Sequence, residues 1–301
     1  MTNKEIIENG NAVLGIEFGS TRIKAVLIND KYEPIANGSY TWENSLDNGI
    51  WTYPITQIHE GLQTCYADLK KDVSEKYGIK LTKFKAAGIS AMMHGYLAFD
   101  KDDNLLVPFR TWRNTITGQA SKELSELFNF PVPERWSASH LYQAILNKED
   151  HVSKIDKVYT LAAYIHYRLT GEKVIGVGDA SGMFPIKTTN GKSEYNPDYA
   201  TKFEKIADVA KYGFKVNEVF PKVLMAGDKA GCLTDAGAKF LDPSGDLTAG
   251  IPFCPPEGDA GTGMAATNSV EVATGNISAG TSVFSMVVLE KDLKKAYPGK
   301  I

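Results

Sequence analysis

The stretch that decides the fold is residues 13–28, Val-Leu-Gly-Ile-Glu-Phe-Gly-Ser-Thr-Arg-Ile-Lys-Ala-Val-Leu-Ile. Apolar residues lie on both sides of a short polar centre, which is the pattern of a buried strand, a tight turn and a second strand. The polar centre carries a glycine, two hydroxyls and two cations, so its backbone N–H groups could approach an anion. An ordinary hairpin with a polar tip explains the same pattern, and this stretch alone does not separate the two interpretations.

Length and composition exclude several classes of protein. The chain has 301 residues, of which 43% are hydrophobic and 23% charged, and its formal net charge is -3. These values are typical of a globular protein that is long enough for two domains, and they give no sign of a nucleic-acid or membrane-surface partner. The three cysteines are far apart, so neither a zinc site nor a disulfide framework is expected. The first ten residues lack an apolar signal core, so we expect a cytoplasmic protein.

The order of the expected elements is that of a mixed α/β protein. Residues 1–11 are polar and predict a loose lead-in, and the three strands that follow have short connections, which imply antiparallel neighbours. The expected strands are 12–18, 22–29, 33–41, 84–90, 96–99, 174–177, 247–253, 270–277 and 283–289. The expected helices are 54–77, 115–128, 138–148, 159–169, 197–210 and 234–240.

A cluster of turn residues, Asp242-Pro-Ser-Gly-Asp246, predicts a domain boundary. It divides the chain into residues 1–245 and residues 246–301. The second part is close to the lower size limit of an independent domain, and it is rich in glycine and in expected strands. We therefore expect it to be the start of a second domain that this chain does not complete.

A glycine-rich stretch at residues 255–267 carries the most prominent carboxylate. Asp259 stands between an expected strand and a helix that would open at residues 260–262, where free N–H groups favour anions. A carboxylate at this place could be a catalytic group or an ordinary helix cap, and the local sequence leaves both open.

A second small hydroxyl-bearing turn strengthens the interpretation of the first. Gly280-Thr281-Ser282 lies between apolar segments, as Gly19-Ser20-Thr21 does. Glu17 stands two residues before the first glycine, and Asp259 lies between the two turns in the sequence. This arrangement indicates two hairpins that close on a polyphosphate, with carboxylates available for Mg²⁺. The P-loop motif G-x-x-x-x-G-K-[ST] is absent, and Gly176–Gly182 is one residue too long for the dinucleotide fingerprint.

Six segments in the same order resemble the N-terminal part of the FGGY carbohydrate kinases, in the actin/Hsp70/sugar-kinase superfamily. The segments are Gly15–Lys24 (first phosphate motif), Gly88–Gly95 (sugar-contacting strand, in its Met-His-Gly form), Thr111–Thr115 (Trp-x-Asp-x-Arg segment), Tyr164–Glu172 with Asp179–Gly182 (Leu-Thr-Gly and Ala-Ser segments), Gly258–Gly263 (catalytic aspartate) and Gly275–Ser282 (second phosphate motif). The resemblance implies a ribonuclease H-like (actin-like ATPase) domain, with a mixed five-stranded sheet flanked by helices, and the start of a second domain of the same type.

The resemblance also implies an activity and its residues. The reaction would transfer the γ-phosphoryl of ATP to a hydroxyl of a small carbohydrate, a ketose such as xylulose or a related sugar or polyol. Asp259 would be the catalytic base, and Glu17 and Asp259 would hold Mg²⁺. The residues implied at the ATP phosphates are Gly19, Ser20, Thr21, Arg22, Lys24, Gly280, Thr281 and Ser282. The residues implied at the sugar are Met93, His94, Gly95, Trp112, Arg113, Asn114 and Trp136.

Ordinary structural roles compete with several of these assignments. Lys24 could be a solvated strand residue, His94 a core histidine, and both tryptophans plain core aromatics. The sugar is the only partner that the resemblance implies, and a homodimer is possible.

Because the sequence departs from the family pattern at several positions, a second hypothesis about its function stays open. Glu17 and Asn114 stand where the family usually has Asp, and Ile116 stands where it usually has Arg. Family members also continue for about another 200 residues, a domain-sized extension. The alternative is a catalytically weak or inactive nucleotide- or sugar-binding protein of the same fold.

Overall fold

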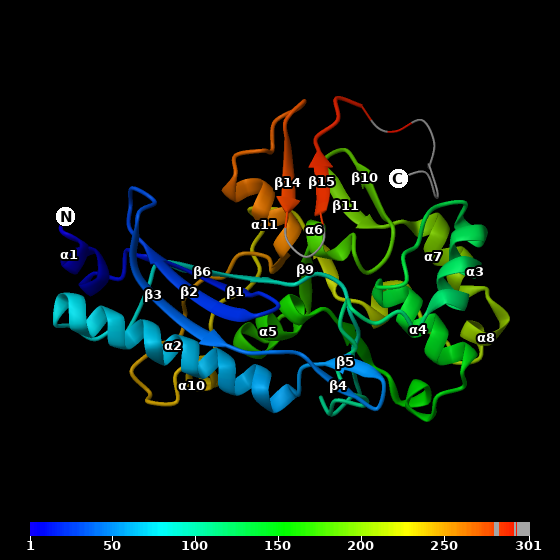
Figure 1. Ribbon diagram of the computed structural model, residues 1–301, viewed down its shortest axis with the longest axis horizontal. Coiled ribbons are helices and arrows are strands. Elements are labelled where there is room, and N and C mark those ends of the chain that lie inside the picture. Colours follow the sequence, from blue (N-terminus) through cyan, green and yellow to red (C-terminus); the bar gives the residue numbers. More distant parts are fainter. Residues whose placement is uncertain (280–282, 292, 294–301) are drawn as a thin grey trace.

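The computed structural model describes residues 1–279, 283–291 and 293. Its centre is a five-stranded sheet in the order β13-β6-β1-β2-β3 (Figure 1). The strands are β1 (Val13–Phe18), β2 (Arg22–Ile28), β3 (Pro34–Thr41), β6 (Ala86–Ala91) and β13 (Glu257–Gly258). β1 pairs antiparallel with β2 and β2 with β3, whereas β6 runs parallel to both β1 and β13. The expected antiparallel strands and the expected mixed five-stranded sheet are confirmed.

One face of this sheet is covered by helices. α2 (Ile55–Tyr77) lies along β2 and β3, and its buried side chains recur at spacings of three and four residues, as an amphipathic helix requires (Figure 1). A Cβ atom at Gly38 of β3 would lie 2.2 Å from the carbonyl oxygen of Cys65, so only glycine allows this close approach. α5 (Leu161–Thr170) packs against β6, and α10 (Asp235–Leu241) contacts both α2 and α5.

Alternation along β1 and β2 leaves the other face of the sheet more open. Leu14, Ile16 and Phe18 are buried, whereas Gly15 and Glu17 point to the opposite side, because successive side chains of a strand alternate. The exposed face is therefore the side on which a ligand could reach the strands.

The remaining helices and hairpins surround this centre. Figure 1 shows α3, α4, α7 and α8 grouped at the end of the molecule away from the N-terminus. The helices not yet given are α1 (Asn3–Glu8), α3 (Gly118–Phe128), α4 (Ser137–Leu146), α6 (Val177–Ala180), α7 (Pro197–Glu204), α8 (Ala207–Ala210), α9 (Val216–Val219), α11 (Asp259–Ala266) and the 3-10 helix Asp150–Lys154. The two-stranded sheets pair β4 (Ser45–Asp47) with β5 (Ile50–Thr52), β7 (Leu97–Phe99) with β8 (Lys157–Tyr159), β9 (Val174–Gly176) with β12 (Lys222–Leu224), β10 (Ile186–Thr189) with β11 (Lys192–Tyr195) and β14 (Gly275–Ala279) with β15 (Val283–Val287). Within the described residues, the helices are too short or too polar to cross a lipid bilayer.

The structure corrects two expectations near the ends of the chain. The predicted loose lead-in contains helix α1, which a reciprocal capping box between Thr2 and Glu5 starts and whose Ile6 and Ile7 are buried. The predicted strand 247–253 is wrong. Only isolated bridges at Pro252 and Phe253 form there, because Gly250 has a φ of 88° and Pro252 lacks an N–H donor.

Smaller differences between the expected and the observed elements are an interrupted helix, a strand that starts later and two additional hairpins. The predicted helix 197–210 is two helices, α7 and α8, and the predicted strand 270–277 starts only at Gly275. Two hairpins, β4–β5 and β10–β11, turn at Asn48-Gly49 and Asn190-Gly191 with positive φ at both central residues. Asn-Gly is the strongest sequence signal for such turns, so these hairpins could have been predicted.

The turn at the predicted domain boundary is bound to α2. The Lys70 ammonium lies 2.9 Å from carboxylate oxygens of both Asp242 and Asp246 and 2.5 Å from the Ser244 hydroxyl. Beyond this turn, β13 returns to the central sheet as its edge strand. The division at residue 245 stays a prediction.

One carboxyl is buried where α5 and α6 meet. Asp179 is 1% exposed, and its Oδ2 accepts a 2.6 Å hydrogen bond from the Thr160 hydroxyl. Its Oδ1 has no partner within the described part of the chain. Burial raises the pKa of Asp179 to about 8, and the negative charges of Glu257 and Asp259 act in the same direction. The folded protein therefore holds a proton on Asp179 at neutral pH.

This proton makes stability depend on pH. Between the unfolded pKa of 3.8 and the folded pKa of about 8, the folded state binds one proton more than the unfolded state, so stability falls as pH rises toward 8. From pH 6.5 to 8.5 we expect the free energy of unfolding to fall by about 2 kcal/mol because of this group. Asp179→Asn, which keeps an acceptor for Thr160, is expected to remove that slope. Denaturant unfolding of both proteins across this range measures the difference, and parallel curves would contradict it.

Candidate active site

A pocket of about 650 Å³ lies on the open face of the sheet. β1, β2, β6, β13 and the start of α11 line it. Of the residues predicted for chemistry, Glu17, Lys24 and Asp259 line this pocket. The chain thus brings together Glu17, from the first hairpin, and Asp259, from the glycine-rich stretch that follows β13.

Glu17 and Lys24 face each other across the β1–β2 hairpin. They are direct partners in the strand register, and the Lys24 ammonium lies 3.5 Å from the Glu17 carboxylate. Both side chains are about half exposed, so this ion pair adds little to stability. Either group can exchange its partner for a ligand at small cost.

Asp259 is the first residue of α11, directly after β13. Gly258 is the N-cap residue of this helix, so the helix-cap interpretation of Asp259 is not what the structure shows. Its Oδ1 accepts a 3.3 Å hydrogen bond from the Met93 N–H, which ties it to the segment after β6. Burial raises the pKa of Asp259, and the negative charge of Glu17 raises it further against the opposing effect of the N–H donors. A carboxylate with a raised pKa is a better proton acceptor near neutral pH.

His94, the residue after Met93, is held in a strained backbone conformation. Its φ of 70° is uncommon for a residue with a side chain, and such outliers concentrate at functional sites. Burial lowers the pKa of His94 to about 4, and the positive charge of Arg135 also lowers it, so the ring is neutral at pH 7. Nδ1 lies 3.2 Å from the carbonyl oxygen of Gly182. Because a carbonyl can only accept, Nδ1 carries the proton and Nε2 is left as an acceptor.

Gly95 connects His94 to the start of α4. Its N–H donates to the carbonyl of Arg135, and its own carbonyl accepts from the Ser137 hydroxyl. Trp136 is thereby brought to the segment that carries His94, and it is partly buried against the core. A Cβ atom at Gly95 would lie 2.8 Å from the carbonyl oxygen of Arg110, so this glycine allows a close backbone approach.

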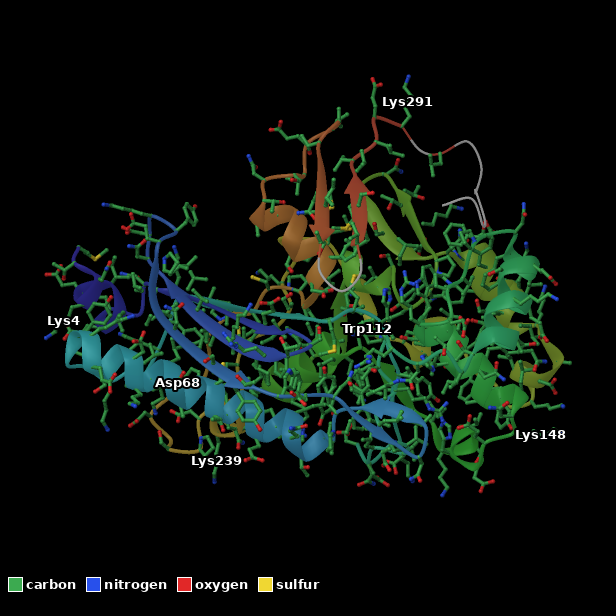
Figure 2. All side chains as sticks on the ribbon, viewed as in Figure 1. Lys4, Asp68, Trp112, Lys148, Lys239 and Lys291 are labelled. Carbon is green, nitrogen blue, oxygen red and sulfur yellow. The ribbon has the colours of Figure 1, made fainter. Side chains whose placement is uncertain are left out.

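The predicted segment Trp112-Arg113-Asn114 lies against the β4–β5 hairpin. Asn114 is buried, its Oδ1 accepts from the N–H of Trp51, and its Nδ2 donates to the carbonyls of Trp51 and Thr111. Arg113 stacks on the Trp51 ring at 3.8 Å and donates to Asn44. Trp112 is partly buried and lies, in the view of Figure 2, between the sheet and the helical end of the molecule. None of these three side chains lines the 650 Å³ pocket.

The residues predicted to contact the ATP phosphates belong to two turns, the β1–β2 turn and residues 280–282. Ser20, Thr21 and Arg22 are exposed at the β1–β2 turn, next to Gly19. Arg22 and Lys24 also line a smaller hollow of about 260 Å³ over β2 and β3. Residues 280–282, which the second turn would supply, lie outside the described residues.

Sequence reasoning missed other polar side chains near Asp259. The Glu257 carboxylate accepts from the N–H groups of Gly178 and Asp179, at 3.3 and 2.9 Å, and burial raises its pKa. The hydroxyls of Ser90 and Thr262 lie 2.9 Å apart across β6 and α11. Glu257 stands in β13, two residues before Asp259, and that spacing was the available signal.

Two carboxylates at the pocket could take part in holding a magnesium ion. Within the described residues, no cluster of three or more His, Cys, Asp or Glu side chains could form an all-protein metal site. Mg²⁺ is usually held by one or two carboxylates, with water and substrate phosphates as its other ligands. The Glu17 and Asp259 carboxylates, both at the pocket, would suffice for such binding.

Comparison with known proteins identifies relatives of this chain. Residues 12–264 match the model of the FGGY family of carbohydrate kinases, N-terminal domain. A xylulose kinase of Escherichia coli is 22% identical over 293 residues, which cover 94% of this chain and 55% of that protein. A gluconokinase of Bacillus subtilis is 25% identical over 224 residues, which cover 66% of this chain and 41% of that protein. The chain thus spans about half the length of the curated relatives it matches.

Solved structures show the same fold. A xylulose kinase of Rhodospirillum rubrum superposes with a TM-score of 0.76 at 18% identity, covering 96% of this chain and 57% of that one. A kinase of Brucella ovis described as a xyloylose kinase gives a TM-score of 0.74 at 21% identity, covering 91% of this chain and 54% of that one. The expected actin-like ATPase fold is therefore confirmed. With most of its length matched to the family model, the chain belongs to the FGGY family of carbohydrate kinases.

Proposed function

We propose that this chain carries the sugar site and part of the phosphate site of an ATP-dependent sugar kinase. The observation that carries the proposal is that Glu17, Lys24 and Asp259 line the same pocket. Phosphoryl transfer needs positioning and charge neutralisation, and these groups supply a proton acceptor, a cation and a carboxylate for a metal. The substrate would be a ketose such as xylulose or a related sugar or polyol, in keeping with the names of the relatives.

In the proposed reaction, a sugar hydroxyl attacks the γ-phosphorus of ATP. Asp259 accepts the hydroxyl proton as the new P–O bond forms, and ADP leaves with the electrons of the bond that breaks. The Met93 N–H holds the Asp259 carboxylate in place, and Nε2 of the neutral His94 accepts a hydrogen bond from another sugar hydroxyl. Mg²⁺, when bound beside Glu17 and Asp259, would neutralise charge on the phosphates.

The proposed second domain has support from exposed apolar side chains. Ile277, Val283 and Val287 of the β14–β15 hairpin are each more than half exposed, and Phe284 is 45% exposed. A cluster of this kind on a short hairpin is typical of a surface that another protein segment covers. A homodimer and a cytoplasmic location stay predictions.

The alternative is a nucleotide- or sugar-binding protein of the same fold with weak or no activity. Glu17 favours it, because its longer side chain replaces the usual Asp at the metal position. Asn114 is weaker support for this alternative, because its Nδ2 donates to two backbone carbonyls. A carboxylate could not make these two hydrogen bonds, so Asn114 has a structural role here. The two hypotheses differ in turnover, not in binding.

Sugar-stimulated release of ADP by the protein that carries this chain tests the proposal. A panel of ketoses, aldoses and polyols is offered with ATP and Mg²⁺, and we expect stimulation by at least one of them. Calorimetric binding of a sugar or of ATP without any turnover would favour the alternative, and no stimulation across the panel would contradict kinase activity.

Removal of the proposed base is expected to abolish the reaction. Asp259→Asn should lower kcat by about 100- to 10,000-fold, because the sugar hydroxyl loses its proton acceptor, with little change in sugar affinity. Asp235→Asn is the matched control, since Asp235 is also the first residue of a helix, α10, and is exposed away from the pocket. Initial rates and calorimetry of both variants measure the effect. An active Asp259→Asn protein would exclude the proposed role.

Loss of the Glu17 carboxylate is expected to change the need for magnesium. Glu17→Gln should raise the Mg²⁺ concentration for half-maximal activity by about tenfold, since one negative ligand is lost. Glu17→Asp keeps the charge and should stay near the native value. A magnesium titration of initial rates compares the three proteins, and an unchanged midpoint for Glu17→Gln would place the metal elsewhere.

A further inference from the structure

Two buried aromatic side chains bind consecutive carbonyl groups of the β1–β2 turn. The Trp42 indole Nε1 donates to the carbonyl of Gly19 at 2.7 Å, and the Tyr53 hydroxyl donates to the carbonyl of Ser20 at 2.6 Å. The two rings stack on each other with centroids 4.2 Å apart, and both side chains are almost completely buried. Rigid donors on a packed aromatic pair therefore fix two successive peptide groups of the turn.

Fixing a carbonyl also fixes the N–H group of the same peptide. The Ser20 N–H shares its peptide with the Gly19 carbonyl, and the Thr21 N–H shares its peptide with the Ser20 carbonyl. The described chain has no cis peptide bonds, so each N–H points away from the aromatic side chain that holds its carbonyl. Neither N–H has an acceptor among the described residues.

The position of the aromatic pair shows which way these N–H groups point. Trp42 contacts Phe18, which is fully buried on the covered face of the sheet. Glu17 precedes Phe18 in β1 and therefore points to the opposite face, where it lines the pocket. A Cβ atom at Gly19 would lie 3.9 Å from Oε1 of Glu17, so the turn itself borders that face. The free N–H groups of Ser20 and Thr21 are thus directed to the pocket side.

We propose that Trp42 and Tyr53 are positioning residues that present the N–H groups of Ser20 and Thr21 to phosphate oxygens of the nucleotide. This inference rests on the proposed function and adds to it the side chains that orient the first phosphate turn. Donors held in place before the ligand arrives bind it without a further cost of ordering the loop. An aromatic pair that served packing alone would not need to leave two adjacent exposed N–H groups without acceptors.

The test removes one hydroxyl and measures phosphate binding. Tyr53→Phe keeps the stacked ring but leaves the Ser20 carbonyl without its donor. We expect affinity for magnesium tripolyphosphate, measured by calorimetry, to fall by about fivefold to tenfold, the usual effect of one hydrogen bond. Sugar affinity should not change. In the native protein, the amide NMR signals of Ser20 and Thr21 should shift when tripolyphosphate is added, and in Tyr53→Phe that shift should shrink.

Tyr77→Phe is the matched control. The Tyr77 hydroxyl also donates to a backbone carbonyl, that of Ile35 at 2.9 Å, at the far end of α2. This variant loses the same kind of bond and should bind tripolyphosphate as the native protein does. If Tyr53→Phe does not fold, Trp42→Phe, which keeps a ring and removes the N–H donor, serves the same test.

The outcomes separate this inference from the proposed function. Native tripolyphosphate affinity in a folded Tyr53→Phe protein would overturn the positioning role and leave the kinase proposal intact. Equal losses in Tyr53→Phe and Tyr77→Phe would also overturn it, because the effect would then be general destabilisation. If the native protein itself does not bind tripolyphosphate, the phosphate site and this inference both fail.

Discussion

The candidate site depends on the short parallel pairing of β13 with β6. Only Glu257 and Gly258 take part, opposite Ser90 and Ala91, yet this contact brings Asp259 to the pocket that Glu17 lines. A Cβ atom at Gly258 would lie 2.1 Å from Cγ of Met93, so this glycine leaves room for the Met93 side chain just beyond the end of β6. The hydrogen bond from the Met93 N–H to Asp259 then continues the link beyond the strand ends. The pairing of β13, together with the bridge between Ala87 and Phe253, thereby unites distant parts of the chain.

Three carboxyl groups lie near this junction, and burial raises the pKa of each of them, which favours the uncharged form. Glu257 and Asp259 stand two residues apart, and Asp179 lies behind them. If all three were ionised in a partly dry site, their repulsion would oppose the pairing of β13. The proton on Asp179 removes one charge, and the N–H groups of Gly178 and Asp179 stabilise the charge on Glu257. The pKa of Asp259 is raised as well, which suits a proton acceptor.

The sequence predicts those helices and strands correctly whose formation depends on the local pattern of residues alone. The first hairpin follows from apolar residues on both sides of a polar turn. Helix α2 follows from the three- and four-residue spacing of its apolar side chains and from Gly78, at which the helix ends. Residues 247–253 looked like a strand because they are apolar, but backbone geometry at Gly250 and Pro252 overrides that preference. The role of Asn114 could not be predicted, because its partner Trp51 is distant in sequence. The same holds for Trp42 and Tyr53, which show their importance only through the carbonyls they bind.

These long-range contacts also change how the departures from the family pattern should be weighed. A residue type at a motif position carries the family role only if its side chain is free to meet the ligand. Asn114 is not free, since its amide holds the β4–β5 hairpin, so its difference from Asp concerns packing more directly than substrate polarity. Glu17 is half exposed at the pocket, and among the described residues its carboxylate pairs with the flexible side chain of Lys24, so it can turn to a ligand. Of these two departures, the one that bears on the proposed chemistry is therefore Glu17, near the end of β1.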